Sequence, residues 1–252
     1  GMEALLRWSS PTRGSVSPAE FIPVAESSGV IMQLGEFVLE TACRQAAEWR
    51  GHGLLPEAFR MWVNVSAKQL SAGGISTLVM ETLESTGLPA SCLGLEVTET
   101  AIVAGGVALE RAQTELRDLH RRGVRIAIDD FGTGFASLGQ LRRFPLDVLK
   151  VDRSFVQGIE HDPKDAAITA NLASLAHALG LTAVAEGIES KGQLKSARAL
   201  GCDVAQGFLF ARPAPPEVIV DHLRSRASAL PADEHETGHG GHAAVASQFG
   251  AS

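Results

Sequence analysis

Short apolar runs of strand length alternate along the chain with longer segments in which apolar residues recur at helical spacing. The apolar runs predict seven strands, at Met2–Trp8, Met61–Ser66, Cys92–Glu99, Arg125–Asp130, Leu146–Asp152, Thr182–Ile188 and Asp203–Phe210. Helices are predicted at Ser17–Ser28, Gly35–Gly51, Ala67–Thr86, Gly106–Arg122, Pro163–Leu179, Lys191–Leu200 and Pro216–Arg226. This alternation indicates a parallel sheet covered by helices, and its regular repetition favours a barrel over an open sheet.

We therefore expect an α/β fold, a TIM-like (βα)8 barrel formed as one domain by residues 1–227. A closed barrel of this kind has eight strands, so the seven predicted strands suggest that its first strand is lacking in this chain. Residues 228–252 contain few large apolar side chains and show no periodicity, which predicts a disordered C-terminal tail.

Lone polar residues stand near the ends of the predicted strands, among Val, Ile, Leu and Ala. They are Glu3, Asn64, Glu96, Asp129 with Asp130, Lys150 with Asp152, Glu186 and Gln206. Taken alone, Asp129 and Asp130 are as well explained by a strand that reaches the surface. In a parallel barrel, however, all these positions converge on the C-terminal mouth, which predicts a functional site there.

Six of the residues expected in this site are acidic, against the two basic residues Lys150 and Arg7. Unpaired carboxylates in a partly buried site would cost several kcal/mol each, so divalent cations are expected to neutralise them. Carboxylate and amide ligands without His or Cys favour Mg²⁺ or Mn²⁺ over Zn²⁺. The charge excess suggests two ions bridged by Asp129, which is typical of phosphodiesterases and phosphatases. A sugar-converting or enolase-like barrel with a single ion is the alternative.

Composition excludes several other classes of protein. The net charge is −7 and the charges are dispersed, which argues against a DNA-binding or RNA-binding surface but permits a small anionic substrate beside metal ions. Cys43, Cys92 and Cys202 are too far apart for a disulfide framework or a zinc motif. Without a membrane span or a signal peptide in the sequence, we expect a soluble, cytoplasmic domain.

Eight ordered motifs resemble those of the EAL domain family, the cyclic di-GMP phosphodiesterases of bacterial signalling. They are Glu3–Trp8 (EALLRW), Ser17–Pro23 (SPAEFIP), Asn64–Ser66 (NVS), Glu96–Glu99 (EVTE), Asp129–Gly134 (DDFGTG), Lys150–Asp152 (KVD), Glu186–Glu189 (EGIE) and Gln206–Phe210 (QGFLF). The resemblance extends from residue 1 to about residue 226 and implies a barrel of the EAL type.

The resemblance implies a role for each site residue. The metal ligands would be Glu3, Asn64, Glu96 and Asp129 for one ion, and Asp129, Asp130 and Glu186 for the second. Lys150 would position or polarise the attacking water, and Glu3, Asp130 and Glu186 would join it as catalytic residues. The substrate contacts would be Arg7, Leu5, Asp152, Glu189 and Gln206. Glu99 lies on the opposite strand face and would anchor the loop after Asp130.

The implied reaction is the hydrolysis of cyclic di-GMP to linear pGpG with two Mg²⁺ or Mn²⁺ ions. The resemblance also implies a homodimer, and an upstream GGDEF or sensor domain that could anchor the full-length protein to a membrane. Two alternatives remain open. One is a catalytically silent EAL domain that binds cyclic di-GMP or a partner protein, and the other is a two-metal phosphodiesterase with a different nucleotide substrate.

Overall fold

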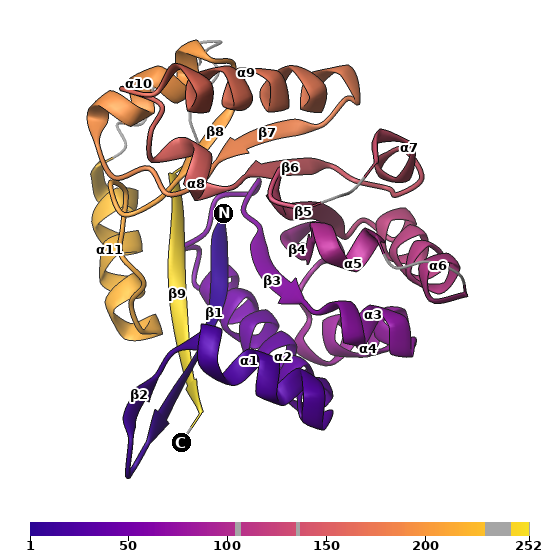
Figure 1. Ribbon diagram of the computed structural model, residues 1–252. Coiled ribbons are helices and arrows are strands. Elements are labelled where there is room, and N and C mark those ends of the chain that lie inside the picture. The colour runs from indigo at the N-terminus through magenta and orange to yellow at the C-terminus, as the bar shows by residue number, and fades with distance from the viewer. Residues whose placement is uncertain (104–106, 135–136, 230–242, 252) are drawn as a thin grey trace.

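Eight parallel strands form the centre of the molecule in the computed structural model, which describes residues 1–103, 107–134, 137–229 and 243–251 (Figure 1). The strands are β1 (Met2–Ser10), β3 (Met61–Val65), β4 (Leu93–Thr98), β5 (Arg125–Phe131), β6 (Val148–Val151), β7 (Thr182–Ala185), β8 (Val204–Gln206) and β9 (Ala243–Ala251). Each strand pairs in parallel with the next, and β9 pairs with both β8 and β1. The predicted barrel fold is confirmed.

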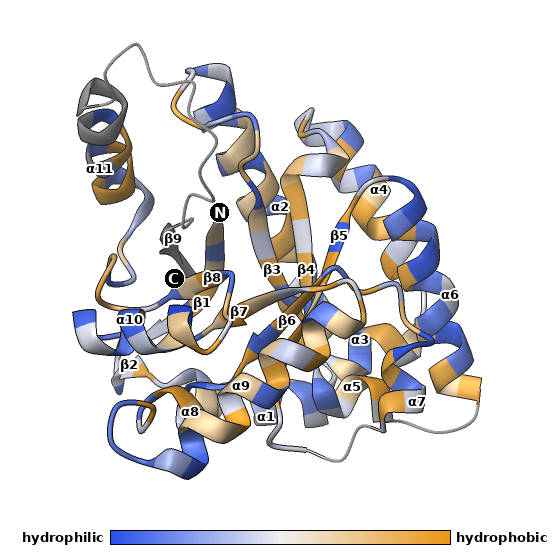
Figure 2. Ribbon diagram, turned by 90° about the horizontal axis from the view of Figure 1, so that it is seen from above, coloured by the Kyte–Doolittle hydropathy of each residue, from blue (hydrophilic) through white to orange (hydrophobic). Residues whose placement is uncertain are grey.

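Helices follow the strands along the chain and surround the sheet. They are α1 (Pro18–Ser28), α2 (Ile31–Gly51), α3 (Ala67–Ala72), α4 (Ile75–Thr86), α5 (Glu99–Val103), α6 (Val107–Arg121), α7 (Leu138–Leu141), α8 (Arg153–Val156), α9 (Pro163–Ala178), α10 (Lys191–Ala199) and α11 (Pro216–Ala229), with a 3-10 turn η1 (Ala90–Cys92). Figure 2 shows largely hydrophobic strands at the centre and helices of mixed hydropathy around them. Every helix in the described part of the chain is too short or too polar to span a lipid bilayer.

Some element boundaries differ from the sequence prediction. The helix predicted at Ala67–Thr86 is divided into α3 and α4, because Gly73 and Gly74 both have positive φ angles and interrupt the helix. The chain also forms a short strand, β2 (Gly14–Val16), which pairs antiparallel with the end of β1 and which the sequence did not predict. The short helices α5, α7 and α8 were missed as well, since each is about one turn long.

The C-terminal segment differs from the prediction of a disordered tail. Residues 230–242 lie outside the described residues, but Ala243–Ala251 forms β9, which pairs with β1 from Met2↔Val245 to Trp8↔Ala251. The pairing closes the ring between β8 and β1. A small-residue strand of this kind gains its partners through the backbone, so hydrophobic periodicity in the sequence does not reveal it.

The core continues on both sides of the sheet, as expected for parallel strands under helices. In β4, Leu93, Leu95 and Val97 are fully buried, and so is Glu96 between them. A carboxylate in the middle of a buried strand is costly unless it has a partner. We therefore expect the residues around Glu96 to compensate its burial.

Candidate active site

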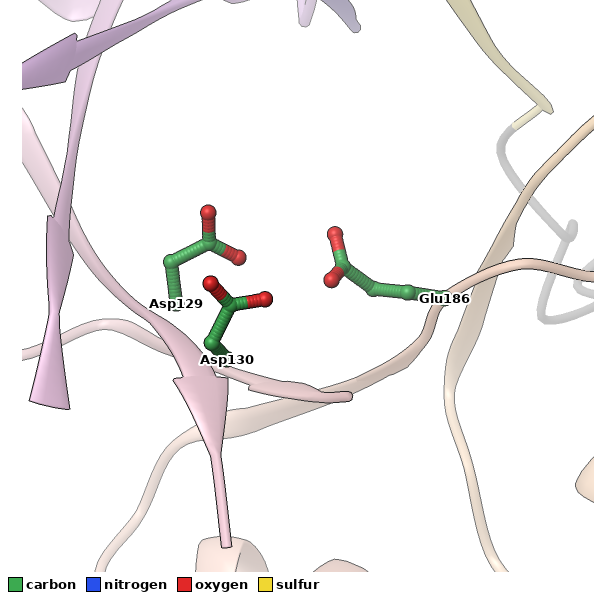
Figure 3. A group of neighbouring side chains, drawn as sticks. All are labelled: Asp129, Asp130 and Glu186. Carbon is green, nitrogen blue, oxygen red and sulfur yellow. The ribbon is translucent and has the colours of Figure 1, made fainter. Parts of the chain in front are cut away.

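Two adjacent aspartates face the same side because β5 is irregular at its end. Ile128 pairs with Leu149 and Phe131 pairs with Val151, so three steps along β5 correspond to two along β6. This bulge contains Asp130, which has a φ of 52° and is the one described non-glycine residue with a positive φ. Aspartate tolerates this left-handed conformation better than most residues. The carboxylates of Asp129 and Asp130 consequently point toward Glu186 across the mouth (Figure 3).

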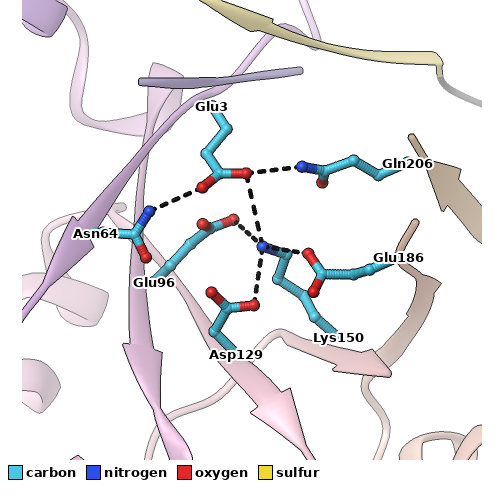
Figure 4. A network of polar contacts seen from close by, with 7 residues as sticks. All are labelled: Glu3, Asn64, Glu96, Asp129, Lys150, Glu186 and Gln206. Carbon is cyan, nitrogen blue, oxygen red and sulfur yellow. Dashed lines mark hydrogen bonds and ion pairs between the residues drawn. The ribbon is translucent and has the colours of Figure 1, made fainter. Parts of the chain in front are cut away.

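A single buried lysine lies at the centre of the acidic residues (Figure 4). Lys150 is 2% exposed. The distances from its Nζ are 2.7 Å to Glu186 Oε1, 2.9 Å to Glu96 Oε1, 3.0 Å to Asp129 Oδ1 and 3.9 Å to Glu3 Oε2. One ammonium group thus faces four carboxylates, and it cannot neutralise all of them.

Two amides fix the orientation of Glu3 at the end of the barrel. Asn64 Nδ2 donates a hydrogen bond of 2.8 Å to Glu3 Oε1, and Gln206 Nε2 donates one of 2.7 Å to Glu3 Oε2. The two amides come from β3 and β8, while Glu3 is on β1. The side chain of Glu3 is therefore held from both sides, with Lys150 farther away.

Burial and mutual repulsion raise the pKa values of three of these carboxyl groups. Burial, then the charge of Glu3, raises the pKa of Glu96 well above its usual value. Burial also raises the pKa of Glu186 to about 8, despite the nearby Lys150. Burial and the charge of Asp129 raise the pKa of Asp130 to about 6. Raised values of this kind are expected where a cluster of carboxylates lacks enough positive charge.

Lys150 and Glu3, in contrast, are stabilised in their charged forms. Although burial alone would favour a neutral amine, Glu96, Glu186, Glu3 and Asp129 raise the pKa of Lys150 well above its usual value. Burial likewise opposes the ionisation of Glu3, but Lys150 and the two amides lower its pKa. Lys150 is thus a fixed ammonium and Glu3 a fixed carboxylate.

The donor set suits hard divalent cations. Glu96 Oε2 and Asp129 Oδ1 are buried without a hydrogen-bond partner in the described part of the chain, since the contact of Asp129 Oδ1 with Lys150 lacks hydrogen-bond geometry. One ligand oxygen from each of Asp129, Asp130 and Glu186 lies within 4.8 Å of the others. Oxygen ligands with unsatisfied negative charge are those that Mg²⁺ and Mn²⁺ prefer.

The other predicted residues lie around this cluster. Asp152 accepts a hydrogen bond from the backbone of Ser154 and caps α8. After burial and the charge of Asp129, Asp152 also contributes to the raised pKa of Asp130. Glu189 and Leu5 line a pocket beside Glu186. Arg7 lines a second hollow beside β1 and α1 that also reaches Asn64 and Asp130, and its guanidinium donates to the carbonyl of Leu6.

Glu99 lies outside the barrel mouth, at the start of α5. Its Oε2 accepts hydrogen bonds from the backbone N–H groups of Gly132 (3.0 Å) and Gly134 (3.1 Å). These two glycines belong to the loop that follows Asp130. The contact connects β4 and α5 to that loop, as the sequence-based hypothesis of a loop anchor requires.

The fold and the cluster together define a class of protein, a (βα)8 barrel whose mouth holds an acidic, oxygen-rich site around a buried lysine. A family model described as "EAL domain" matches residues 1–213 of this chain. The chain belongs to the EAL domain family.

Several named relatives are similar to most of the chain. It is 42% identical over 220 residues to the "bifunctional diguanylate cyclase/cyclic di-GMP phosphodiesterase MucR" of Pseudomonas aeruginosa, a match that covers 87% of this chain and 31% of MucR. It is 41% identical over 226 residues to the "cyclic di-GMP phosphodiesterase NbdA" of the same species, covering 89% of this chain and 28% of NbdA. The chain spans about a quarter to a third of the length of such curated relatives.

Solved structures agree with these matches. A structure described as "PaMucR Phosphodiesterase, c-di-GMP complex" superposes with a TM-score of 0.80 at 40% identity and covers 86% of each chain. The EAL domain of Mycobacterium smegmatis DcpA superposes with a TM-score of 0.71 at 38% identity, covering 76% of this chain and 84% of that one.

Proposed function

We propose that this chain hydrolyses one phosphodiester bond of cyclic di-GMP and releases linear pGpG, in a reaction that requires Mg²⁺ or Mn²⁺. The observation that carries the proposal is the group of four carboxylates around Lys150, in which two buried oxygens lack hydrogen-bond partners among the described residues. Such a cluster is expensive to maintain and is expected where it serves chemistry. The relatives named for this activity support the choice of substrate.

Two groups of ligands would hold the ions. Glu3, Asn64, Glu96 and Asp129 would bind the first ion, and Asp129, Asp130 and Glu186 the second. When bound, a pair of divalent ions activates a water and stabilises the charge on the attacking and leaving oxygens. Asn64 and Gln206 would keep Glu3 in place, because each amide donates to one of its oxygens.

Lys150 acts as a hydrogen-bond donor in this proposal. The surrounding carboxylates raise its pKa well above the usual value, which favours the protonated form that can donate. Its Nζ would orient the attacking water and offset the negative charge that develops on the phosphate. Arg7 would donate to a phosphate oxygen, because its guanidinium lies at the end of β1 beyond Glu3 and has no carboxylate partner among the described residues.

The deciding experiment is hydrolysis of cyclic di-GMP by this chain with Mg²⁺ or Mn²⁺, followed by chromatography of the products. We expect pGpG to form, to disappear when the metal is chelated, and to be absent with Glu3→Ala. Binding of cyclic di-GMP without turnover would contradict the enzyme hypothesis and favour a catalytically silent receptor. If the chain hydrolyses another cyclic dinucleotide faster than cyclic di-GMP, the proposed metal-dependent reaction stands but the proposed substrate is wrong.

The oligomeric state, the location and the neighbouring domains of the chain are part of the same proposal. A homodimer, a cytoplasmic location and a GGDEF or sensor domain in the full-length protein stay predictions. MucR carries a diguanylate cyclase activity in its name, in addition to the phosphodiesterase, which supports such an arrangement for this chain. The masses of the purified chain and of its complexes in solution would test the homodimer.

A further inference from the structure

A cavity opens inside the barrel at its N-terminal end, opposite the acidic mouth. Its volume is about 290 Å³. Its rim includes Arg60, which directly precedes β3, together with Thr182 and Val204, the first residues of β7 and β8. Because these strands run parallel, the three positions lie at the same end of the barrel. The cavity extends inward as far as Glu96 and Lys150.

Small side chains opposite a single large one leave this space open. The interior of a (βα)8 barrel is usually filled by layers of bulky, branched side chains. Here the ring of Trp62 lies over Gly94 of the neighbouring strand β4, where a Cβ would come within 2.2 Å of Trp62 Cε3. On the next strand, β5, Ala127 contributes only a methyl group to the wall. The interior at this end of the barrel is therefore only partly filled.

The walls of the cavity are mainly apolar. Val148, Val184 and Val204 line it together with Trp62. Water in such a space finds few hydrogen-bond partners, and apolar cavities of about 150 Å³ can bind a molecule of the size of benzene. A volume of about 290 Å³ is therefore sufficient for one aromatic ring with a polar substituent.

One cationic side chain at the rim lacks a partner. Arg60 is two positions before Trp62, so the two side chains leave the chain on the same side. The Nε atom of Arg60 is buried and has no hydrogen-bond partner in the described part of the chain, and Arg60 forms no ion pair there. A buried donor without an acceptor is costly, so an acceptor that enters the cavity is favourable. The planar guanidinium group matches the two oxygens of a carboxylate.

We propose that this cavity is a second binding site, which takes a small aromatic carboxylate. The carboxylate accepts hydrogen bonds from the guanidinium group of Arg60 at the rim, and the ring lies among Trp62, Val148 and Val184 inside the barrel. The apolar walls favour the ring, and the unpaired cation selects an anion over a neutral or cationic ligand. The inference goes beyond the proposed function, because this site is reached from the end opposite the mouth and requires neither metal nor cyclic dinucleotide.

The test measures the binding of benzoate, benzamide and benzylammonium, which share one ring and differ in charge. Dissociation constants for the whole chain in the presence of a chelator are obtained from ligand-observed NMR titrations. Arg60→Met is paired with Arg121→Met, an exposed arginine at the end of α6. Val204→Phe places a ring in the cavity and is paired with Val218→Phe, an exposed valine of α11. Thermal unfolding confirms that each variant folds, and Thr182→Leu at the same rim replaces Val204→Phe if that variant does not.

Benzoate should bind the wild type more tightly than benzamide, and benzylammonium should not bind. Arg60→Met should weaken benzoate by about 10- to 100-fold, as expected when a hydrogen bond between charged groups is lost, and should leave benzamide nearly unchanged. Val204→Phe should weaken both ligands by about 10-fold or more, because its ring occupies their space. The two control variants should match the wild type.

Several results would overturn the proposal. If benzoate does not bind the wild type at concentrations up to about 10 mM, where ligands of this size are expected to bind, the cavity is not a site for this class of ligand. If benzamide binds as tightly as benzoate, or Arg60→Met binds benzoate as the wild type does, recognition of the carboxylate by Arg60 is wrong. If Val204→Phe leaves binding unchanged, the ligand lies outside the cavity. None of these results bears on the hydrolysis of cyclic di-GMP, so the proposed function is tested separately.

Discussion

The two ends of the barrel use acidic residues in opposite ways. Asp147, just before β6, accepts hydrogen bonds from the backbone N–H of Ile126 (2.9 Å) and from His120 Nε2 (3.2 Å), and it pairs with Arg125. At the other end, Glu96 and Asp129 keep buried oxygens without hydrogen-bond partners in the described structure. The same chemical group is a satisfied structural tie at one end and an unsatisfied ligand at the other.

A second residue repeats the structural pattern of Asp147. Asp203 precedes β8 and accepts from the backbone N–H of Ala183 (2.8 Å) and from His177 Nε2 (2.9 Å). In both cases the histidine lies in the last turn of the preceding long helix, α6 or α9. The start of each strand is thus tied to its neighbour and to a helix. The comparison teaches that Asp147 and Asp203 are hydrogen-bonded to backbone and histidine, whereas Glu96 and Asp129 keep oxygens without such partners among the described residues.

Removing the central cation should produce the largest effect. Lys150→Met leaves four carboxylates without their ammonium, and breaking a buried charge cluster costs about 3–5 kcal/mol. The metal-free variant should unfold at a lower temperature than the wild type, and added Mn²⁺ should raise its melting temperature more than it raises that of the wild type. Lys195→Met, on the exposed side of α10, is the control. Equal metal-induced shifts in Lys150→Met and wild type would contradict the expectation that the ammonium of Lys150 and the metal ions offset the charge of the same carboxylates.

The second prediction separates activity from stability at the acidic end. Glu96→Gln removes a proposed metal ligand and should lower kcat more than about 100-fold. Loss of a residue that only hydrogen-bonds to a metal ligand typically costs up to about 100-fold. Its metal-free stability should equal or exceed that of the wild type, because the pKa of Glu96 shows that its charge is unfavourable there. Kinetics and thermal unfolding measure the two effects, with the exposed Glu81→Gln as control. A marked loss of stability would make Glu96 a structural residue.

At the end of the barrel that contains Asp147, we expect a substitution to lower stability and to leave activity nearly unchanged. Asp147→Ala leaves the N–H of Ile126 without its partner and should destabilise the chain by about 1–3 kcal/mol. The metal-saturated kcat should stay within about twofold of the wild type, since surface-side ties do not touch the mouth. Urea unfolding and initial rates at 25 °C provide the measurement, and Asp221→Ala, which is exposed, serves as control. A loss of kcat without a loss of stability would remove the distinction between the two ends.

The last prediction concerns the dependence of stability and metal affinity on pH. The pKa of Glu186 is raised to about 8 and that of Asp130 to about 6, so the folded metal-free chain holds protons that the unfolded chain has released. Its stability should therefore fall as the pH rises from about 5 to 8. Metal affinity should rise over the same window, because the ion displaces those protons. Melting temperatures in chelator and in Mn²⁺ at several pH values test this, and a metal-free stability that increases with pH would contradict it.

The sequence predicted the barrel and most of its mouth because polar residues interrupt otherwise apolar strands. Glu96 and Lys150 stand out in this way, and the structure brings them within 2.9 Å. Alternation alone could not place Asp129 and Asp130 on one side, since a regular strand would turn consecutive residues to opposite faces. The bulge in β5 results from pairing with β6, which local sequence does not encode.

Other features were missed for related reasons. The partners of Asp147 and Asp203 come from other elements, so no spacing along the chain reveals them. Contacts between distant segments determine these roles.

The hydrogen bond from Gln206 to Glu3 joins residues 203 positions apart. Closing a loop of that length is slow relative to forming local helices and neighbouring strands. During synthesis, Glu3 leaves the ribosome long before Gln206 exists, so β1 must wait for the C-terminal part of the barrel before its glutamate is fixed. The site would then be completed in the last stage of folding, and a partly synthesised chain would have no active mouth.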